Sequence, residues 1–508
     1  MSSSDTSAGR EGWAPIVGAL VAIVIAGLVA LEPRDFALDD AWIHLAYAKS
    51  LRLGDGLSYN PGDWETGFSS PLWVLLLTVW PLAADPVVPV MALGVLLHGV
   101  TAGVTGWLAL RLGRERASLE QPLPLWSITL LASVLGATLP MAVQGAVSGM
   151  EVPLASATLL AAVAAAIVGA SAPAGLLGAL AVLARPEALP FLLTFGASAW
   201  LWRRRTDASP PRRRAPLWAA GGACLGLAAW VVHCLVVSGH PWPNTQIIKG
   251  RGGGPAGLEY LASEVLPWQP WLVSLTGVVL IVVALRRDLA ERRGELACLV
   301  AAFALTWIAI ATTRPLHPGV QFYESRYFAP FAVVPAVVLP FGLRGLGRWL
   351  AIALVLPVAV FTGLQLDQIR SIAQANAEDT RTLHTVVARW LAVNLPPDAI
   401  VAVEGAGAHR YWTPRTMTIV DLVGLNDRRA ARLHHDRVGK LCHFVRRGPT
   451  HMVIPVDWFP VYAGTFMLEP IAAFDDPEYT QVDPPRPMRV VVFTIAGVHP
   501  TWAERCVP

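Results

Sequence analysis

Two adjacent acids, Asp39 and Asp40, open a segment with the residue types needed for proton transfer. They belong to the loop 32–70, which holds seven acidic residues and follows an apolar stretch. Successive helical positions diverge by about 100°, so the two carboxylates must face different partners. A carboxylate just outside a membrane span could take the proton of a hydroxyl group while a lipid-linked group leaves. The alternative is that Asp39 only caps the helix expected for residues 40–53.

Seven other side chains have the chemistry to bind a sugar or a phosphate. Carboxylates accept hydrogen bonds from hydroxyl groups, cations bind phosphate oxygens, and tryptophan rings can stack on sugars. The candidates for substrate binding are Glu65, Glu151, Arg185, Lys249, Arg326, Trp64 and Trp242. Each also has a structural alternative, such as an ion pair, a charge at a helix end or a solvated loop residue. Arg185 is the most unusual, because a charge between two apolar segments is costly, and its alternative is a snorkelling side chain.

The histidines of the C-terminal region do not form a recognisable metal site. His434, His435, His443 and His451 lie near Cys442, but their spacing matches no four-ligand zinc pattern. The chain also has no Walker motif and no G-x-G-x-x-G, so nucleotide-sugar use and ATP-driven transport have no support. The sequence leaves a metal requirement open.

The rest of the chain must hold these residues at a membrane. Of its 508 residues, 54% are hydrophobic and 15% are charged, against about 25% charged residues in soluble chains. This excludes a soluble enzyme, a nucleic-acid-binding module and a disordered scaffold, and it makes the lipid bilayer a partner. A helix that crosses a bilayer needs about 20 apolar residues. We expect eleven spans, at residues 13–31, 87–110, 123–141, 151–169, 173–184, 188–202, 216–237, 270–285, 295–312, 327–343 and 349–366.

Arginines and lysines orient these spans. With the N-terminus in the cytoplasm, the loops on that side hold sixteen of them, and the outer loops before residue 367 hold eight. Because positive residues favour the cytoplasmic side, we expect this orientation. It places the loop 32–70 and the tail from residue 367 on the outer face.

Residues 367–508 have the composition of a soluble domain, whereas residues 1–366 form the membrane module. The strands expected in this tail are 399–403, 418–422 and 489–495. Strands that alternate with helices are typical of a small α/β domain. Cys442 and Cys506 both lie in the tail, and the sequence leaves open whether they pair. The predicted fold class is therefore a mainly α, polytopic membrane protein with a small C-terminal α/β domain outside the membrane.

Six stretches resemble the GT-C superfamily of polytopic membrane glycosyltransferases. The segment DDAWIHLAYAKSLRLGDGLSYNPGDWETGFSSPLW, which starts at Asp39, is similar to the DDAYI signature of enzymes that use polyprenyl-phosphate sugars. Actinobacterial terminal arabinofuranosyltransferases are among those enzymes. The sequence departs from the signature at Trp42 and His44, where Tyr and a small polar residue are more usual. The other similar stretches are SGMEVPL (148–154), ARPEAL (184–189), GHPWPNTQIIKG (239–250), ESRYFAPF (324–331) and VEGAGAHRYWTPRTMTIVDLVGLND (403–427).

The resemblance implies transfer of a sugar from polyprenyl phosphate to a glycan or glycolipid of the cell envelope, with inversion at the anomeric carbon. Asp39 would be the general base. Asp40 would orient the acceptor or, as in some relatives, help to hold a divalent cation. Arabinofuranose is one sugar that the resemblance suggests, although mannose, an aminosugar or another pentose fits the same residues. The implied location is the bacterial cytoplasmic membrane.

Two alternatives come from other functional classes. A transporter or flippase of lipid-linked glycans would need charged or broken helices in the membrane, and usually internal repeats. Only the interruption at 184–189 fits that description, and no repeat is visible. A non-catalytic assembly subunit could bind glycan through its outer tail, but the intact acid pair argues against it.

Overall fold

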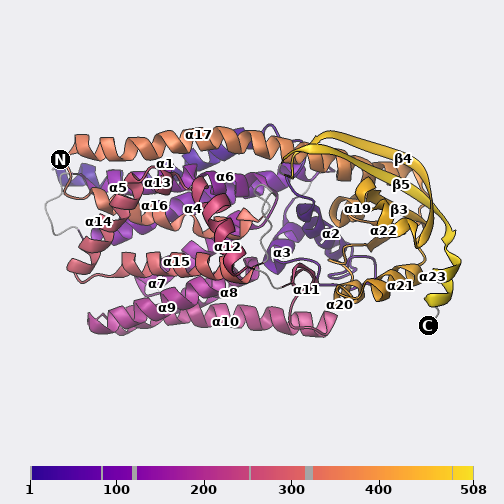
Figure 1. The fold of residues 1–508 in the computed structure, drawn as a ribbon. Helices are drawn as coiled ribbons and strands as arrows, with labels where there is room; N and C mark the ends of the chain where they lie inside the picture. The colour runs from indigo at the N-terminus through magenta and orange to yellow at the C-terminus, as the bar shows by residue number, and fades with distance from the viewer. Residues whose placement is uncertain are drawn as a thin grey trace. The chain divides into compact units, whose positions relative to one another are not determined.

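The chain folds into two compact units in the computed structural model, which describes residues 3–81, 84–116, 123–206, 208–250, 253–314, 324–482 and 484–506. Figure 1 draws the elements of both units. The first outer loop belongs to the same unit as the tail, whereas the sequence-based division at residue 366 groups it with the helices. Unit 1 comprises Met1–Glu32, Ala84–Ala229 and Arg251–Ala373, and unit 2 comprises Pro33–Ala83, Trp230–Gly250 and Gln374–Pro508.

Unit 1 is built of helices. Apolar helices satisfy their own backbone hydrogen bonds, which is what the interior of a bilayer requires. Two of them, α10 and α17, continue into unit 2. The helices are α1 (Ser3–Ala30), α4 (Val87–Arg114), α5 (Leu125–Thr138), α6 (Pro140–Val147), α7 (Val152–Val168), α8 (Ser171–Ala184), α9 (Ala188–Arg205), α10 (Pro210–Ser238), α12 (Pro255–Tyr260), α13 (Pro270–Val273), α14 (Thr276–Ala290), α15 (Glu295–Thr313), α16 (Val334–Val338) and α17 (Arg348–Thr380).

Five helices in the described part of the chain are long and apolar enough to cross a membrane. The pair α5 and α6, bent by 53° at its break, adds a sixth if it is one span. Shorter apolar helices, α7 and α8 among them, accompany these. The chain is therefore a multi-pass membrane protein, as predicted. The five long helices are Glu11–Ala30, Val87–Arg114, Pro210–Ser238, Glu295–Thr313 and Arg348–Asn394. The last of these comprises α17, the helical turn that follows it and α18 (Val386–Asn394).

Two of the eleven predicted spans are not single α-helices. The span predicted at 270–285 is divided between α13 and α14. The span predicted at 327–343 is a series of short helical turns around α16. Pro330, Pro335 and Pro340 lie in these turns, and each removes a backbone donor that a continuous helix would use.

Unit 2 contains a five-stranded sheet with strand order β2-β1-β3-β5-β4. β1 pairs in parallel with β2 and β3, and β5 pairs antiparallel with β3 and β4. The strands are β1 (Ile400–Val403), β2 (Thr418–Asp421), β3 (His451–Pro455), β4 (Phe466–Tyr479) and β5 (Arg486–Val498). The helices of the unit are α2 (Asp40–Arg52), α3 (Pro71–Val79), α11 (Asn244–Lys249), α18 (Val386–Asn394), α19 (Ala406–Trp412), α20 (Arg428–Arg432), α21 (Arg437–Arg447), α22 (Phe459–Ala463) and α23 (Pro500–Arg505).

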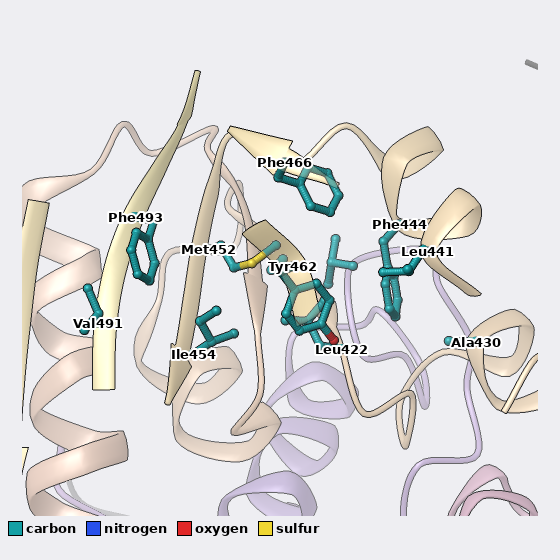
Figure 2. Packing of buried hydrophobic residues seen from close by; sticks show 12 residues of the cluster. Leu422, Ala430, Leu441, Phe444, Met452, Ile454, Tyr462, Phe466, Val491 and Phe493 are labelled. Atoms are coloured by element: carbon teal, nitrogen blue, oxygen red, sulfur yellow. The ribbon is translucent and has the colours of Figure 1, made fainter. Parts of the chain in front are cut away.

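One hydrophobic core joins the sheet to the helices of the tail. Figure 2 shows Met452 of β3 and Phe493 of β5 among side chains from α21 and α22, including Phe444 and Tyr462. All four side chains are at most 5% exposed. Burial of a large apolar side chain contributes about 1.5–3 kcal/mol. This core therefore fixes α21, which carries several polar residues discussed below, against the sheet.

The predicted fold class is confirmed. Helices make up 69% of the structure and the sheet is small. The three strands expected in the tail are present as β1, β2 and β5, and β3 and β4 are additional. The parallel pairing of β1 with β2 and β3 agrees with the predicted α/β organisation.

A disulfide joins Cys442 of α21 to Cys506, 64 positions along the chain. A cross-link that closes a loop of this length removes denatured-state entropy worth about 4 kcal/mol. Replacing both cysteines by Ser is therefore expected to lower the stability of the tail by about that amount. Limited proteolysis of the tail across a urea series measures the change, with Cys224→Ser as the control because Cys224 is a free thiol. Equal protease resistance of the double variant and the native chain would contradict this expectation.

Candidate functional site

The carboxylate of Asp39 is held by the tail of the chain. Asp39 precedes α2, yet its side chain makes no capping bond to that helix, so the capping interpretation is wrong. Its two oxygens accept hydrogen bonds from the backbone N–H groups of Gly407 (2.7 Å) and Ala408 (2.8 Å). Both donors lie in the first turn of α19, directly after β1. Backbone N–H groups at a helix start are suited to a negative charge.

Gly407 makes this contact possible. A Cβ added at this position would overlap the backbone oxygen of Asp39 and crowd the side chain of Trp42. Trp42, one of the two departures from the family signature, is fully buried and donates from its indole N–H to Asp35 (2.9 Å). Burial raises the pKa of Asp35 to about 6, with hydrogen bonds from neighbours acting in the opposite direction. The tryptophan therefore has a structural role beneath the acid pair.

The imidazole of His409 is neutral at pH 7. Burial lowers the pKa of His409, on α19, to about 4, and the neighbouring His384 lowers it further while Asp39 raises it. The rings of His409 and His384 lie 6.1 Å apart. At neutral pH His409 therefore brings no positive charge to Asp39, whose carboxylate is held by the backbone N–H groups.

Asp40 faces a cation. Its Oδ2 lies 3.8 Å from Nζ of Lys249, the last residue of α11. Both side chains are about one fifth exposed, at 20% and 23%. The structure thus brings together two residues that the sequence selected 209 positions apart, and it leaves both accessible to a substrate.

The side chain of Glu65 connects its own loop to the first residue of α11 and to the first residue of α20. Its Oε2 accepts hydrogen bonds from the side chain of Asn244 (2.9 Å) and from the backbone N–H of Arg428 (3.1 Å). The guanidinium of Arg428 lies 3.7 Å from its other oxygen. Burial, opposed by these hydrogen bonds and by Arg428, raises the pKa of Glu65 to about 7. Trp64 and Trp242 lie in the same unit and are 49% and 44% exposed, so their rings are available for stacking.

The raised pKa of Glu65 predicts a pH dependence. Because the ordinary value is 4.5 and the folded value is about 7, the folded state keeps a proton that the unfolded state loses between these pH values. Stability from this group is therefore lost as the pH rises from 4.5 to 7, by about 3 kcal/mol at most. Glu65→Gln keeps an acceptor for Asn244, so it should melt at a higher temperature than the native chain at pH 8 and at the same temperature near pH 4.5. A constant difference in melting temperature across this range would contradict the assignment.

Glu151, Arg185 and Arg326 lie together in unit 1. Arg185 pairs with Glu151 (2.8 Å) and with Glu187 (3.4 Å), and all three of these side chains are at most 4% exposed. The buried ion pairs exclude the snorkelling interpretation of Arg185. Glu187 is not among the site residues predicted from the sequence, although it lies two positions after Arg185.

Three arginines surround the ring of Tyr327. The guanidinium carbons of Arg185, Arg314 and Arg326 lie 4.9, 5.2 and 5.5 Å from the ring centroid. Arg314 also forms an ion pair with Glu187. Arginine and tyrosine attract each other through the face of the ring. Tyr327 and Arg314 were not selected from the sequence, and the motif ESRYFAPF was the only signal for the tyrosine.

The acid pair by itself supplies few of the ligands of a divalent cation. Such a cation takes about six oxygen ligands, and each oxygen of Asp39 already accepts one backbone N–H group, while Asp40 lies beside the ammonium group of Lys249. Within the described residues, no three or more His, Cys, Asp or Glu side chains are placed to hold a metal. His443 contacts Asp427 instead, at 2.7 Å.

The comparisons with known proteins concern the tail and the whole fold. Residues 368–492 match a family described as a domain of unknown function (DUF8728). None of the curated proteins compared with the chain matches it. The fold is similar to two crystal structures of ArnT from Cupriavidus metallidurans, one in the apo state and one bound to undecaprenyl phosphate. Each similarity extends over 94% of this chain and 97% of the ArnT chain, with 14% sequence identity and a TM-score of 0.58.

The fold is also similar to the archaeal oligosaccharyltransferase AglB from Archaeoglobus fulgidus, solved in complex with an inhibitory peptide and a dolichol-phosphate. That similarity covers 88% of this chain and 70% of AglB, at 12% identity and a TM-score of 0.53. Identities this low show a shared fold and do not carry a substrate from one protein to another. The mainly α, polytopic fold predicted from the sequence agrees with these similarities.

Proposed function

We propose that this chain is a membrane glycosyltransferase that moves one sugar from a polyprenyl-phosphate donor to an acceptor glycan or glycolipid of the cell envelope. The observation that carries the proposal is the fold shared along 94% of the chain with ArnT, which was solved with undecaprenyl phosphate bound. The acid pair beside Lys249 adds the groups that such a transfer needs. Arabinofuranose is the sugar we propose first, on the resemblance of the first-loop motif.

The proposed reaction is a single displacement at the anomeric carbon. Asp39 takes the proton of the acceptor hydroxyl, whose oxygen bonds to the anomeric carbon from the face opposite the phosphate. The bond from that carbon to the phosphate oxygen breaks, and its electron pair leaves with polyprenyl phosphate. The configuration at the carbon is inverted. Asp40 orients the acceptor, with Lys249 beside it.

Asp39 can serve as the base while the tail holds it. Each carboxylate oxygen has two lone pairs, and a backbone N–H uses one of them. The second pair on either oxygen is therefore available for the proton of the acceptor. The alternative is the reverse assignment, in which Asp40, whose side chain is 20% exposed, is the base and Asp39 is the positioning residue. The variants in the Discussion distinguish the two.

A polyprenyl-phosphate donor needs cations that bind its phosphate. Arg185, Arg314 and Arg326 supply three guanidinium groups around Tyr327, and Glu151 and Glu187 hold two of them by ion pairs. We assign phosphate binding to this cluster, because arginine forks match phosphate oxygens. Preformed ion pairs keep the forks oriented before the donor binds.

The location follows from the same proposal. A bacterial cytoplasmic membrane, with the N-terminus inside and the tail outside, agrees with the positive residues of the loops. The Cys442–Cys506 disulfide supports an outer position for the tail, because disulfides persist in oxidising compartments.

Release of polyprenyl phosphate tests the function. Purified full-length protein in detergent is incubated with a panel of radiolabelled polyprenyl-phosphate sugars and an envelope extract as the acceptor. We expect release from one donor by the native chain and none above background by the Asp39→Asn, Asp40→Asn double variant. No release from any donor by folded native protein would overturn the proposal in favour of a transporter or an assembly subunit.

A further inference from the structure

A polar cavity of about 320 Å³ in unit 2 has no part in the transfer step proposed above. Residues of the first outer loop, the segment after β2 and the end of α21 line it. Asp39, Asp40 and Lys249 are not among its lining residues. Its volume lies at the lower end of the range for small-molecule sites, about 300–1,000 Å³. The cavity is therefore sized for a small polar group such as one sugar residue.

Four arginines line this cavity, and two of them have no carboxylate partner in the described part of the chain. Arg428 pairs with Glu65 at 3.7 Å, and Arg447 lies 3.3 Å from Asp63. Arg446 donates from Nε to the backbone oxygen of Cys506 (3.1 Å). For Arg429 the described residues provide no side-chain partner. The guanidinium groups of Arg429 and Arg446 are therefore not held by a carboxylate of the described residues.

Two of the acids that line the cavity, Asp421 and Asp427, already have hydrogen-bond partners. Asp421 accepts hydrogen bonds from the backbone N–H groups of Gly424 and Asn426, each at 2.8 Å. Asp427 caps α20 with one oxygen and contacts His443 with the other. Asp63, which is 41% exposed beside Arg447, and Oε1 of Glu65, which has only the ion pair with Arg428, remain as acceptors for hydroxyl groups.

Burial adjusts the charge of the cavity in the same direction. It raises the pKa of Glu65 to about 7, so this carboxyl carries only about half a charge at neutral pH. It also raises the pKa of Asp421 to about 6. Near pH 7 these two shifts lower the negative charge of the four acids that line the cavity, so the four arginines outweigh it, while acceptors for hydroxyl groups remain.

The walls of the cavity are fixed before any ligand binds. The disulfide holds Cys506, whose backbone oxygen orients Arg446. The side chain of Asn60 exchanges two hydrogen bonds with the backbone of Ile419 in β2 (2.9 and 3.0 Å). A site built on held residues loses little conformational entropy on binding.

The short helix α11 links this cavity to the acid pair. Its first residue, Asn244, donates to Glu65, and its last, Lys249, lies beside Asp40. Five residues of α-helix rise by about 7.5 Å. One short helix therefore contacts a residue of the cavity at its start and a residue of the acid pair at its end.

We propose that this cavity binds a negatively charged sugar residue, a phosphorylated or uronic-acid unit, of the acceptor glycan. Arg429 and Arg446 take the anionic group, and Asp63 and Glu65 accept the hydroxyl groups. This inference rests on the proposed function for the word acceptor, but the binding itself does not depend on transfer.

Ligand binding to the full-length native protein in detergent tests the inference without any donor. Isothermal titration at pH 7 compares glucose 6-phosphate, mannose 6-phosphate, glucuronate and galacturonate with glucose and inorganic phosphate. We expect at least one anionic sugar to bind at least tenfold more tightly than both glucose and inorganic phosphate. The variant with Arg429→Ala and Arg446→Ala should weaken this binding at least tenfold. Arg437→Ala is the control, because Arg437 lies on α21 but does not line the cavity.

Each other outcome overturns the inference in a defined way. If inorganic phosphate binds as tightly as the anionic sugars, the cavity recognises an anion only. If glucose binds as tightly as they do, the cavity does not recognise the charge. Unchanged affinity in the double variant, or no binding by any of the four anionic sugars, removes the site. Native-like melting of the variants shows that they are folded. If the native chain releases polyprenyl phosphate from no donor, the proposed function is wrong. The interpretation of this binding measurement does not change in that case.

Discussion

Asp39→Asn is expected to lower the rate of sugar transfer by about 10²–10⁴-fold, the contribution of a positioned general base. The same variant should also lose stability. The carboxylate accepts two backbone N–H groups, from Gly407 and Ala408, and an Asn presents an NH₂ group to one of them. One buried donor left without its acceptor costs about 1–3 kcal/mol. Single-turnover release of polyprenyl phosphate gives the rate, and thermal melting of the same preparation gives the stability.

Two further variants separate the chemical effect from the structural one. Gly407→Ala forces the same contact apart but leaves the carboxylate at Asp39, since the new Cβ would overlap the backbone oxygen of Asp39. Asp40→Asn keeps the contact and removes the carboxylate beside Lys249. We expect Gly407→Ala to lose stability with less than a tenfold loss of rate. Asp40→Asn should raise KM for the acceptor more than it lowers kcat.

The opposite pattern would reassign the roles of the acid pair. A large loss of kcat in Asp40→Asn, at unchanged stability, would make Asp40 the base. Equal losses of rate in Gly407→Ala and Asp39→Asn, at equal stability, would leave Asp39 with a structural role alone. In each case the measurement that decides is the rate at matched stability.

The sequence predicted the parts of this fold that depend on local pattern. The apolar blocks predicted a multi-pass protein, because a helix of about twenty apolar residues matches the thickness of a bilayer. Short runs rich in β-branched residues predicted β1, β2 and β5. The long β4 was missed because Pro470 and Pro477 interrupt its pattern, and as an edge strand it tolerates them.

Contacts between distant segments could not be predicted in this way. The backbone partner of Asp39 lies 368 residues along the chain, and no local pattern records such a pair. The same holds for Arg314 and Tyr327, whose importance lies in their shared position with Arg185. The sequence shows that Cys442 and Cys506 are present, but only the fold shows that they are close enough to form a disulfide.

Arg185→Lys is expected to raise KM for the polyprenyl-phosphate donor by about 10–100-fold. Lysine keeps the positive charge that Glu151 and Glu187 require, so the fold should survive. It lacks the planar fork that binds two phosphate oxygens at once. Hydrogen bonds to charged groups are worth about 1.5–3 kcal/mol, and every 1.4 kcal/mol changes affinity tenfold. The measurement is the donor dependence of polyprenyl-phosphate release at saturating acceptor.

Glu151→Gln is the matched control for this cluster. It removes the 2.8 Å partner of Arg185 while Glu187 still pairs with the same guanidinium. If the arginine binds phosphate, loss of a competing carboxylate should leave the donor KM unchanged or lower it. If the arginine is only structural, both variants should lose stability together and keep the native KM. Arg185→Gln is a poorer test, because it strands two buried carboxylates at a cost of about 3–5 kcal/mol. A donor KM for Arg185→Lys within twofold of native would therefore remove Arg185 from the phosphate site.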